Sequence, residues 1–163
     1  MGLETIHPEV LPKLNKQLTP DEFRKAAIFL TERGIDVRAF ILLNPPYLTQ
    51  PQDSIDWTLR SIRFAFGSGA ARCSVIPVRP GNGVMEVLQK ENHYIPPSLS
   101  MLEEVMEKAL LLRQGQVFVD TWDINFLSSC TTCFDTRKDR LERMNLIQEI
   151  IPPIHCDCIH SYD

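Results

Sequence analysis

Two patterns of hydrophobic residues divide most of this chain into predicted helices and strands. Phe23, Ala26, Ala27 and Leu30 recur at the spacing of a core-facing helical stripe. The segment 37–43 is instead almost continuously apolar, as in a strand of a parallel sheet that is buried on both faces. The same two patterns repeat along the chain. They predict helices at about 19–33, 55–66, 98–113 and 135–150, and strands ending near 4, 43, 78 and 120.

Local signals support these boundaries. Thr19-Pro20-Asp21-Glu22 is typical of a helix start, because Thr19 and Glu22 can form a capping box and proline fits the first helical position. Gly34 suits the left-handed end of that helix. Asn44-Pro45-Pro46 ends the following strand, since proline cannot donate to a strand ladder.

Strands and helices alternate in this order, which predicts an α/β fold with a parallel sheet. Parallel sheets carry their chemistry at the carboxyl ends of the strands. The expected positions are 4–5, 44–45, 79–81 and 120–121. We expect residues 1–120 to form this sheet region and residues 121–163 a small cysteine-bearing tail. A first strand at Gly2 would leave an open sheet edge, so we expect either another chain to cover it or the sequence to be part of a longer one.

Composition restricts the partners. The 163 residues carry a net charge of −4, so any contact with nucleic acid requires a local basic patch. The run 137–140 together with Arg143 is the candidate, although such a run is more often a solvated helix face. No apolar run is long enough to cross a bilayer, and the first residues do not resemble a signal peptide, so we expect no membrane partner and a cytoplasmic location.

Four of the five cysteines are spaced as metal ligands. Cys130-x-x-Cys133 and Cys156-x-Cys158 form two close pairs, and zinc favours tetrahedral sets of thiolates. The same thiolates suit an iron–sulfur cluster, and Cys130 with Cys133 alone would suit a redox pair. His155 and His160 are spare ligands. Cys73 lies in an apolar strand and is interpreted as a buried hydrophobic residue.

Longer stretches of the sequence resemble a known family. "GLET…HPEVLPKLNK" with "RGIDVRAFILLNPP" resembles the fourth strand, fourth helix and fifth strand of the partial TIM barrel of radical S-adenosylmethionine (SAM) enzymes. "VIPVRPGNG" is similar to the sixth-strand segment of the branch containing the Elongator catalytic subunit and the methylthiotransferases, with Asn82 at a usual threonine. "DTWD…CTTCFDTR" resembles most closely the radical SAM proteins of archaeosine synthesis.

This resemblance implies a function in tRNA modification and covers almost the whole chain. In such enzymes a [4Fe–4S] cluster held by Cys-x-x-x-Cys-x-x-Cys reduces SAM to a 5′-deoxyadenosyl radical. That motif is absent from these 163 residues, which therefore resemble the C-terminal half of the barrel. The implied partners are SAM, a tRNA or another tRNA-modification protein, and the N-terminal half-barrel that carries the cluster.

The resemblance also assigns roles to individual residues. Glu4 matches the position that binds the ribose hydroxyls of SAM, and Lys16 the position that pairs with its carboxylate. The backbone at Ile76 and Pro77 would flank the adenine, and Arg79 would face the substrate. Arg38 interrupts an apolar strand, so it is expected inside the barrel, in contact with SAM or substrate or in an ion pair.

Two other functions compete with this one. The chain is alternatively a non-catalytic metal-binding interaction domain derived from the same fold, or a thiol oxidoreductase using Cys130 and Cys133.

Overall fold

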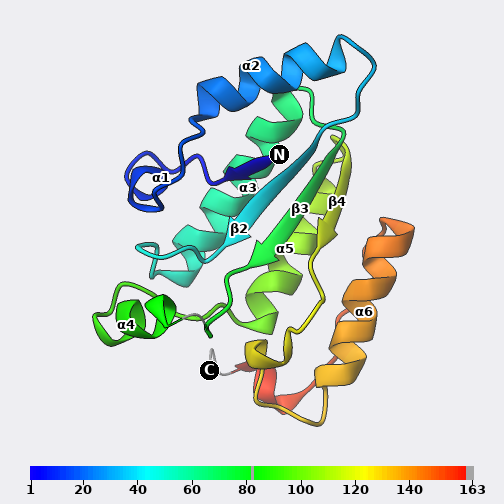
Figure 1. Cartoon of the computed structure of the whole chain (residues 1–163). Coiled ribbons are helices and arrows are strands. Elements are labelled where there is room, and N and C mark those ends of the chain that lie inside the picture. Colours follow the sequence, from blue (N-terminus) through cyan, green and yellow to red (C-terminus); the bar gives the residue numbers. More distant parts are fainter. Residues whose placement is uncertain (82, 161–163) are drawn as a thin grey trace.

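A computed structural model describes residues 1–81 and 83–160, with side chains as far as Cys158. Its centre is a parallel sheet of four strands in the order β1 (Gly2–Glu4), β2 (Arg38–Leu43), β3 (Arg72–Pro77) and β4 (Gln116–Val119) (Figure 1). Each strand therefore pairs with its neighbour in sequence, and helices connect them. The expected α/β class is confirmed, and the arrangement is consistent with part of a β/α barrel.

The described residues form six α-helices: α1 (Val10–Lys13), α2 (Pro20–Thr31), α3 (Pro51–Gly67), α4 (Val84–Lys90), α5 (Leu99–Leu111) and α6 (Phe134–Ile147). Two short 3₁₀ turns, Asn125–Leu127 and Asp157–His160, follow in the tail. The capping box of α2 is present: the Glu22 amide donates to Thr19 Oγ1 at 3.2 Å, and the Thr19 amide donates to Glu22 Oε2 at 2.8 Å. None of the helices in the described ranges is long and apolar enough to cross a membrane.

Three helices differ from the expectation. The sequence analysis did not predict α1 and α4, which are short and lack the long apolar stripe that marks a core helix. The last helix, α6, ends at Ile147 instead of residue 150, because Gln148 takes a left-handed conformation with φ of 56° and stops the helical repeat.

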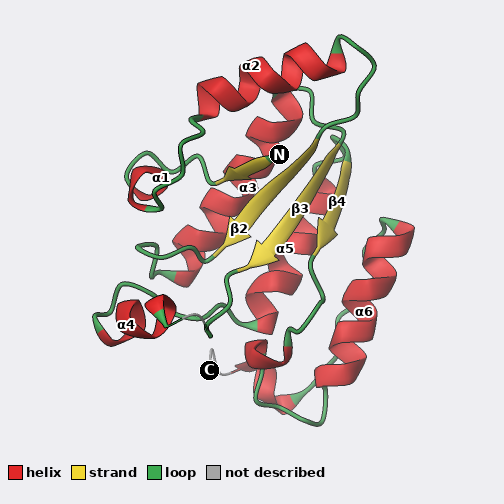
Figure 2. Cartoon of the chain, viewed as in Figure 1, coloured by secondary structure: helices red, strands yellow, loops and turns green. Residues whose placement is uncertain are grey.

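Helices α3 and α5 cover one face of the sheet, and the core lies between them and the strands (Figure 2). In β2, Ala39, Ile41 and Leu43 point to this face and are fully buried. Arg38 and Phe40 alternate with them and are exposed on the opposite face. Because side chains alternate between the faces of a strand, this pattern explains how a charged residue fits an otherwise apolar strand.

The outer edge of β4 is sealed by two side-chain amides of the α6 region. Asn145 accepts from the Val119 amide at 2.9 Å and donates to the Val119 carbonyl at 2.8 Å. Gln148 forms the same pair of bonds with Val117, both at 2.8 Å. These amides take the place that a further strand would occupy, so the sheet ends at β4.

Candidate functional site

A cavity of about 320 Å³ opens at the carboxyl ends of the first three strands. Five of the residues chosen from the sequence line it: Glu4, Lys16, Ile76, Pro77 and Arg79. The other walls are mostly apolar and include Leu14, Leu42, Pro46 and Met85. The volume lies within the range of small-molecule sites, and an apolar cavity with a few converging polar groups is typical of them.

Glu4 and Lys16 form the charged side of this cavity. Lys16 Nζ lies 3.3 Å from Glu4 Oε1, and the Glu4 side chain is 15% exposed whereas that of Lys16 is 51% exposed. The chain returns to Glu4 through the single turn of α1 and a left-handed residue, Asn15, with φ of 53°. The turn thereby places a lysine twelve residues along the chain beside the end of β1.

The backbone at Glu4 is itself unusual. Its φ is 63°, a region that residues other than glycine, asparagine and aspartate seldom occupy. Gly2 makes room for the Glu4 carboxylate, since a Cβ at Gly2 would lie 2.5 Å from Glu4 Oε1. Strained residues of this kind concentrate at functional sites, where the surrounding structure holds them.

Arg79 also lines this cavity. Its Nη2 donates to Asp120 Oδ2 at 2.8 Å and to the Trp122 carbonyl, and its guanidinium lies 5.1 Å from the centre of the Trp122 ring. Asp120 Oδ1 also accepts from the Trp122 amide at 3.0 Å. Asp120 therefore fixes both Arg79 and the loop after β4, a link for which the sequence offered only the position of Asp120 at a strand end.

Arg38 does not join these residues. It begins β2, so it lies about 17 Å along the strand from the carboxyl end, at about 3.3 Å per residue. Its guanidinium packs over the Phe118 ring at 4.7 Å. The structure therefore places Arg38 on the helix-free face of the sheet and outside the cavity that holds the other five residues.

The four tail cysteines come together in a second site. Their sulfur atoms all lie within 4.8 Å of one another. Cys130 Sγ is 3.8 Å from Cys156 Sγ, and Cys133 Sγ is 3.4 Å from Cys158 Sγ. A tetrahedral ion with metal–sulfur distances of about 2.3 Å holds its sulfurs about 3.8 Å apart, so the cluster can hold a metal ion.

The surroundings push the thiol pKa values in opposite directions. The backbone amide of Cys133 donates to Cys130 and lowers the pKa of Cys130 to about 6. Burial raises the pKa of Cys133, and contact with the Cys133 sulfur raises the pKa of Cys158 to about 12. Because four thiolates this close repel one another, full deprotonation requires a cation among them.

The two histidines considered as spare ligands are not part of this cluster as described. His155 is exposed and does not belong to the group of four sulfurs. The side chain of His160 lies outside the described residues.

A buried ion-pair network fastens α6 and the tail to α5. Arg137 donates to Glu103 Oε2 at 2.7 Å and to Ser100 Oγ at 2.9 Å. Arg140 pairs with Glu103 at 3.3 Å and with Glu107 at 2.5 Å. It also donates to the carbonyl oxygens of residues 151 and 152, with Nε at 3.0 and 2.9 Å.

This network contradicts both interpretations of the basic run 137–140, as a nucleic-acid contact and as a solvated helix face, for its two arginines. Both Arg137 and Arg140 are 3% exposed, so neither is a solvated helix charge or a free basic patch. The sequence did contain a signal: these arginines share a helix face with Leu141 and Met144, which are fully buried. Acidic partners on α5 offset the cost of removing these two charges from water.

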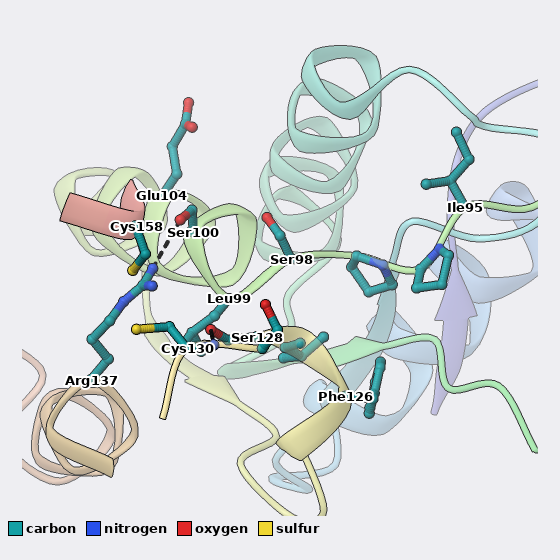
Figure 3. A pocket seen from close by; sticks show the side chains of 14 residues that line it. Ile95, Ser98, Leu99, Ser100, Glu104, Phe126, Ser128, Cys130, Arg137 and Cys158 are labelled. Carbon is teal, nitrogen blue, oxygen red and sulfur yellow. Dashed lines mark hydrogen bonds between the residues drawn. The ribbon is translucent and has the colours of Figure 1, made fainter. Parts of the chain in front are cut away.

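A larger cavity, of about 540 Å³, adjoins the cysteines. Figure 3 shows Cys130, Cys158 and Arg137 at one end of it and Ile95 at the other. Four serines, at 98, 100, 128 and 129, contribute hydroxyl groups to its lining. Two of the four cysteines, Cys130 and Cys158, therefore line a cavity, while Cys133 is 3% exposed.

No model of a known protein family matches this chain, and no curated protein sequence does so either.

Proposed function

We propose that this chain is the SAM-binding, substrate-facing part of a radical SAM enzyme that modifies tRNA. The observation that supports the proposal is the 320 Å³ cavity, because it gathers five residues that the family resemblance selects from two separate stretches of the chain, 4–16 and 76–79. The cluster that drives the chemistry would be held by residues other than these 163, which lack the Cys-x-x-x-Cys-x-x-Cys motif.

The chemistry of the cavity residues fits the parts of SAM. A carboxylate such as Glu4 accepts two hydroxyl hydrogen bonds, as the ribose requires, and an ammonium such as Lys16 pairs with the methionine carboxylate. Ile76 and Pro77 offer an apolar wall for the adenine. Without ligand, Glu4 and Lys16 neutralise each other at 3.3 Å, so binding replaces this ion pair with two contacts to SAM.

Calorimetric titration with SAM tests the proposal. We expect the chain to bind SAM, and Glu4→Gln or Lys16→Ala to weaken binding about 10- to 100-fold, the effect of losing a hydrogen bond to a charged group. Gly2→Ala should weaken it too, by displacing the Glu4 carboxylate. Lys25→Ala is the matched control, since Lys25 is exposed on α2 away from the cavity. Equal binding by all variants, or none by the unaltered chain, would refute the assignment.

A second function is supported by the cysteine cluster: a zinc-binding interaction domain. All sulfurs lie within 4.8 Å, close to the spread around one ion, whereas the thiolates of an iron–sulfur cluster bind separate irons and stand further apart. With four thiolates the ion has no open position, which favours a structural site.

Metal analysis of the purified chain tests this second function. We expect about one zinc per chain, lost in a Cys133→Ser variant and retained in Cys73→Ser, whose cysteine is buried in β3. Colour and inorganic sulfide in the unaltered chain would indicate a cluster and contradict the single-ion assignment.

A further inference from the structure

Two close sulfur contacts in the cysteine cluster cross between two chain segments. Cys130 and Cys133 come directly before α6, whereas Cys156 and Cys158 lie in the segment that follows this helix. The contacts at 3.8 and 3.4 Å each join one cysteine of the first pair to one of the second. Their partners are 26 and 25 positions apart in the sequence.

The cluster is also accessible to a small oxidant. Cys130 and Cys158 line the 540 Å³ cavity, and Cys130, Cys156 and Cys158 are all partly exposed. Cys133 is buried beside Arg137, whose Nη1 lies 4.0 Å from its sulfur. A peroxide molecule entering the cavity therefore meets Cys130, which has Cys156 at 3.8 Å, or Cys158, which lies 3.4 Å from the buried Cys133 and also interacts with Cys130 and Cys156.

We propose that Cys130 and Cys156 are a site of oxidative modification by hydrogen peroxide, at which a disulfide across the tail replaces the metal ion. This proposal rests on the metal-binding role of the four cysteines.

The reaction balances with peroxide as the sole oxidant. One thiolate attacks a peroxide oxygen, so that an S–O bond forms, the O–O bond breaks and hydroxide leaves. The second thiolate attacks that sulfur, forming the S–S bond and displacing a second hydroxide. The two sulfurs lose two electrons and peroxide gains them. The two hydroxides take two protons from solvent, and the ion passes to a chelator because two of its four ligands are gone.

The pairing determines what happens to the tail. A disulfide between Cys130 and Cys156 closes a loop that contains α6. It therefore holds the segment after α6 against the loop before α6, and a metal ion shared by the four cysteines would connect the same two segments. A disulfide within either motif would close a very short loop and leave the two segments unconnected. The disulfide between the two segments thus replaces the metal ion as the link between them, and the segment after α6 stays in place when the metal is lost.

Peptide mapping of the zinc-loaded full chain under non-reducing conditions tests the proposal. After one equivalent of hydrogen peroxide with a chromogenic chelator present, we expect release of the zinc together with a linked peptide pair containing Cys130 and Cys156. Limited proteolysis should then cut the tail no faster than in the zinc-loaded chain. Cys156→Ser should abolish this linkage, whereas Cys73→Ser should leave it unchanged, since Cys73 is fully buried in the sheet.

Each other outcome contradicts the proposal. A Cys130–Cys133 or Cys156–Cys158 link would show that the crossed contacts do not direct the reaction, and sulfonic acids without any link would show that no second thiol intercepts the first product. Zinc that stays bound under peroxide would refute the site's reactivity. Zinc stoichiometry is measured before peroxide is added, so a chain without metal would refute the metal site itself and is distinguishable from these results.

Discussion

Arg140 gives the sharpest test of how the tail is fastened. Its side chain is 2% exposed and joins α5 to the carbonyl oxygens that precede the second cysteine pair. Removing one partner of a buried ion pair costs about 3–5 kcal/mol, because the remaining groups stay buried and unpaired. We take the low end, about 3 kcal/mol, for Arg140→Met, since Glu103 keeps Arg137 and Glu107 is 35% exposed to water.

Urea unfolding followed by circular dichroism measures this loss. With a typical slope of about 2 kcal/mol per molar urea, a loss of about 3 kcal/mol lowers the midpoint by about 1.5 M. The urea midpoint of Arg140→Lys should lie between those of the unaltered chain and of Arg140→Met, since one ammonium cannot reach both carboxylates and both carbonyls. Arg143→Met is the matched control because Arg143 is exposed on the same helix. If Arg140→Met lowers stability no more than Arg143→Met does, the network does not hold the tail.

Three further outcomes follow from particular contacts. Asn145→Ala should cost about 1–3 kcal/mol in urea unfolding and speed hydrogen exchange of the Val119 amide, because both bonds at the β4 edge are lost; unchanged exchange would contradict the sealed edge. Gly115→Ala, a separate variant, should lower the free energy of unfolding by about 1–3 kcal/mol, since its Cβ would lie 2.9 Å from the Ala71 carbonyl oxygen. A melting temperature equal to that of the unaltered chain would contradict this. In the metal-free chain, alkylation of Cys130 should rise through pH 6 and level off above it, because its pKa is lowered to about 6, and mass spectrometry should find no alkylation of the buried Cys73 there. The low folded-state pKa also means that the stability contributed by Cys130 is present above the ordinary thiol pKa and lost as pH falls through 6.

The sequence alone determined the elements whose cause is local. The capping box at Thr19 and Glu22, the glycine after α2 and the apolar run of β2 each depend on neighbouring residues, so their positions were predicted to within a few residues. The spacing of the four cysteines likewise predicted one shared site, since close pairs on two segments favour a common ion. The ends of parallel strands also directed attention to the edge of the sheet where the cavity lies.

Only the tertiary structure decided the rest. Arg137 and Arg140 look like surface charges in the sequence, and their burial depends on acidic residues more than thirty positions away on α5. The amides of Asn145 and Gln148 seal β4 because α6 lies beside it, which no local pattern indicates. Arg38 was expected beside SAM or substrate, or in an ion pair, but it lies at the start of β2, packs over Phe118 and does not line the cavity. Only the packed sheet fixes which end of a strand a site occupies. Long-range pairing of this kind depends on the whole fold, so the type of a residue and its neighbours in sequence do not determine which partners it contacts.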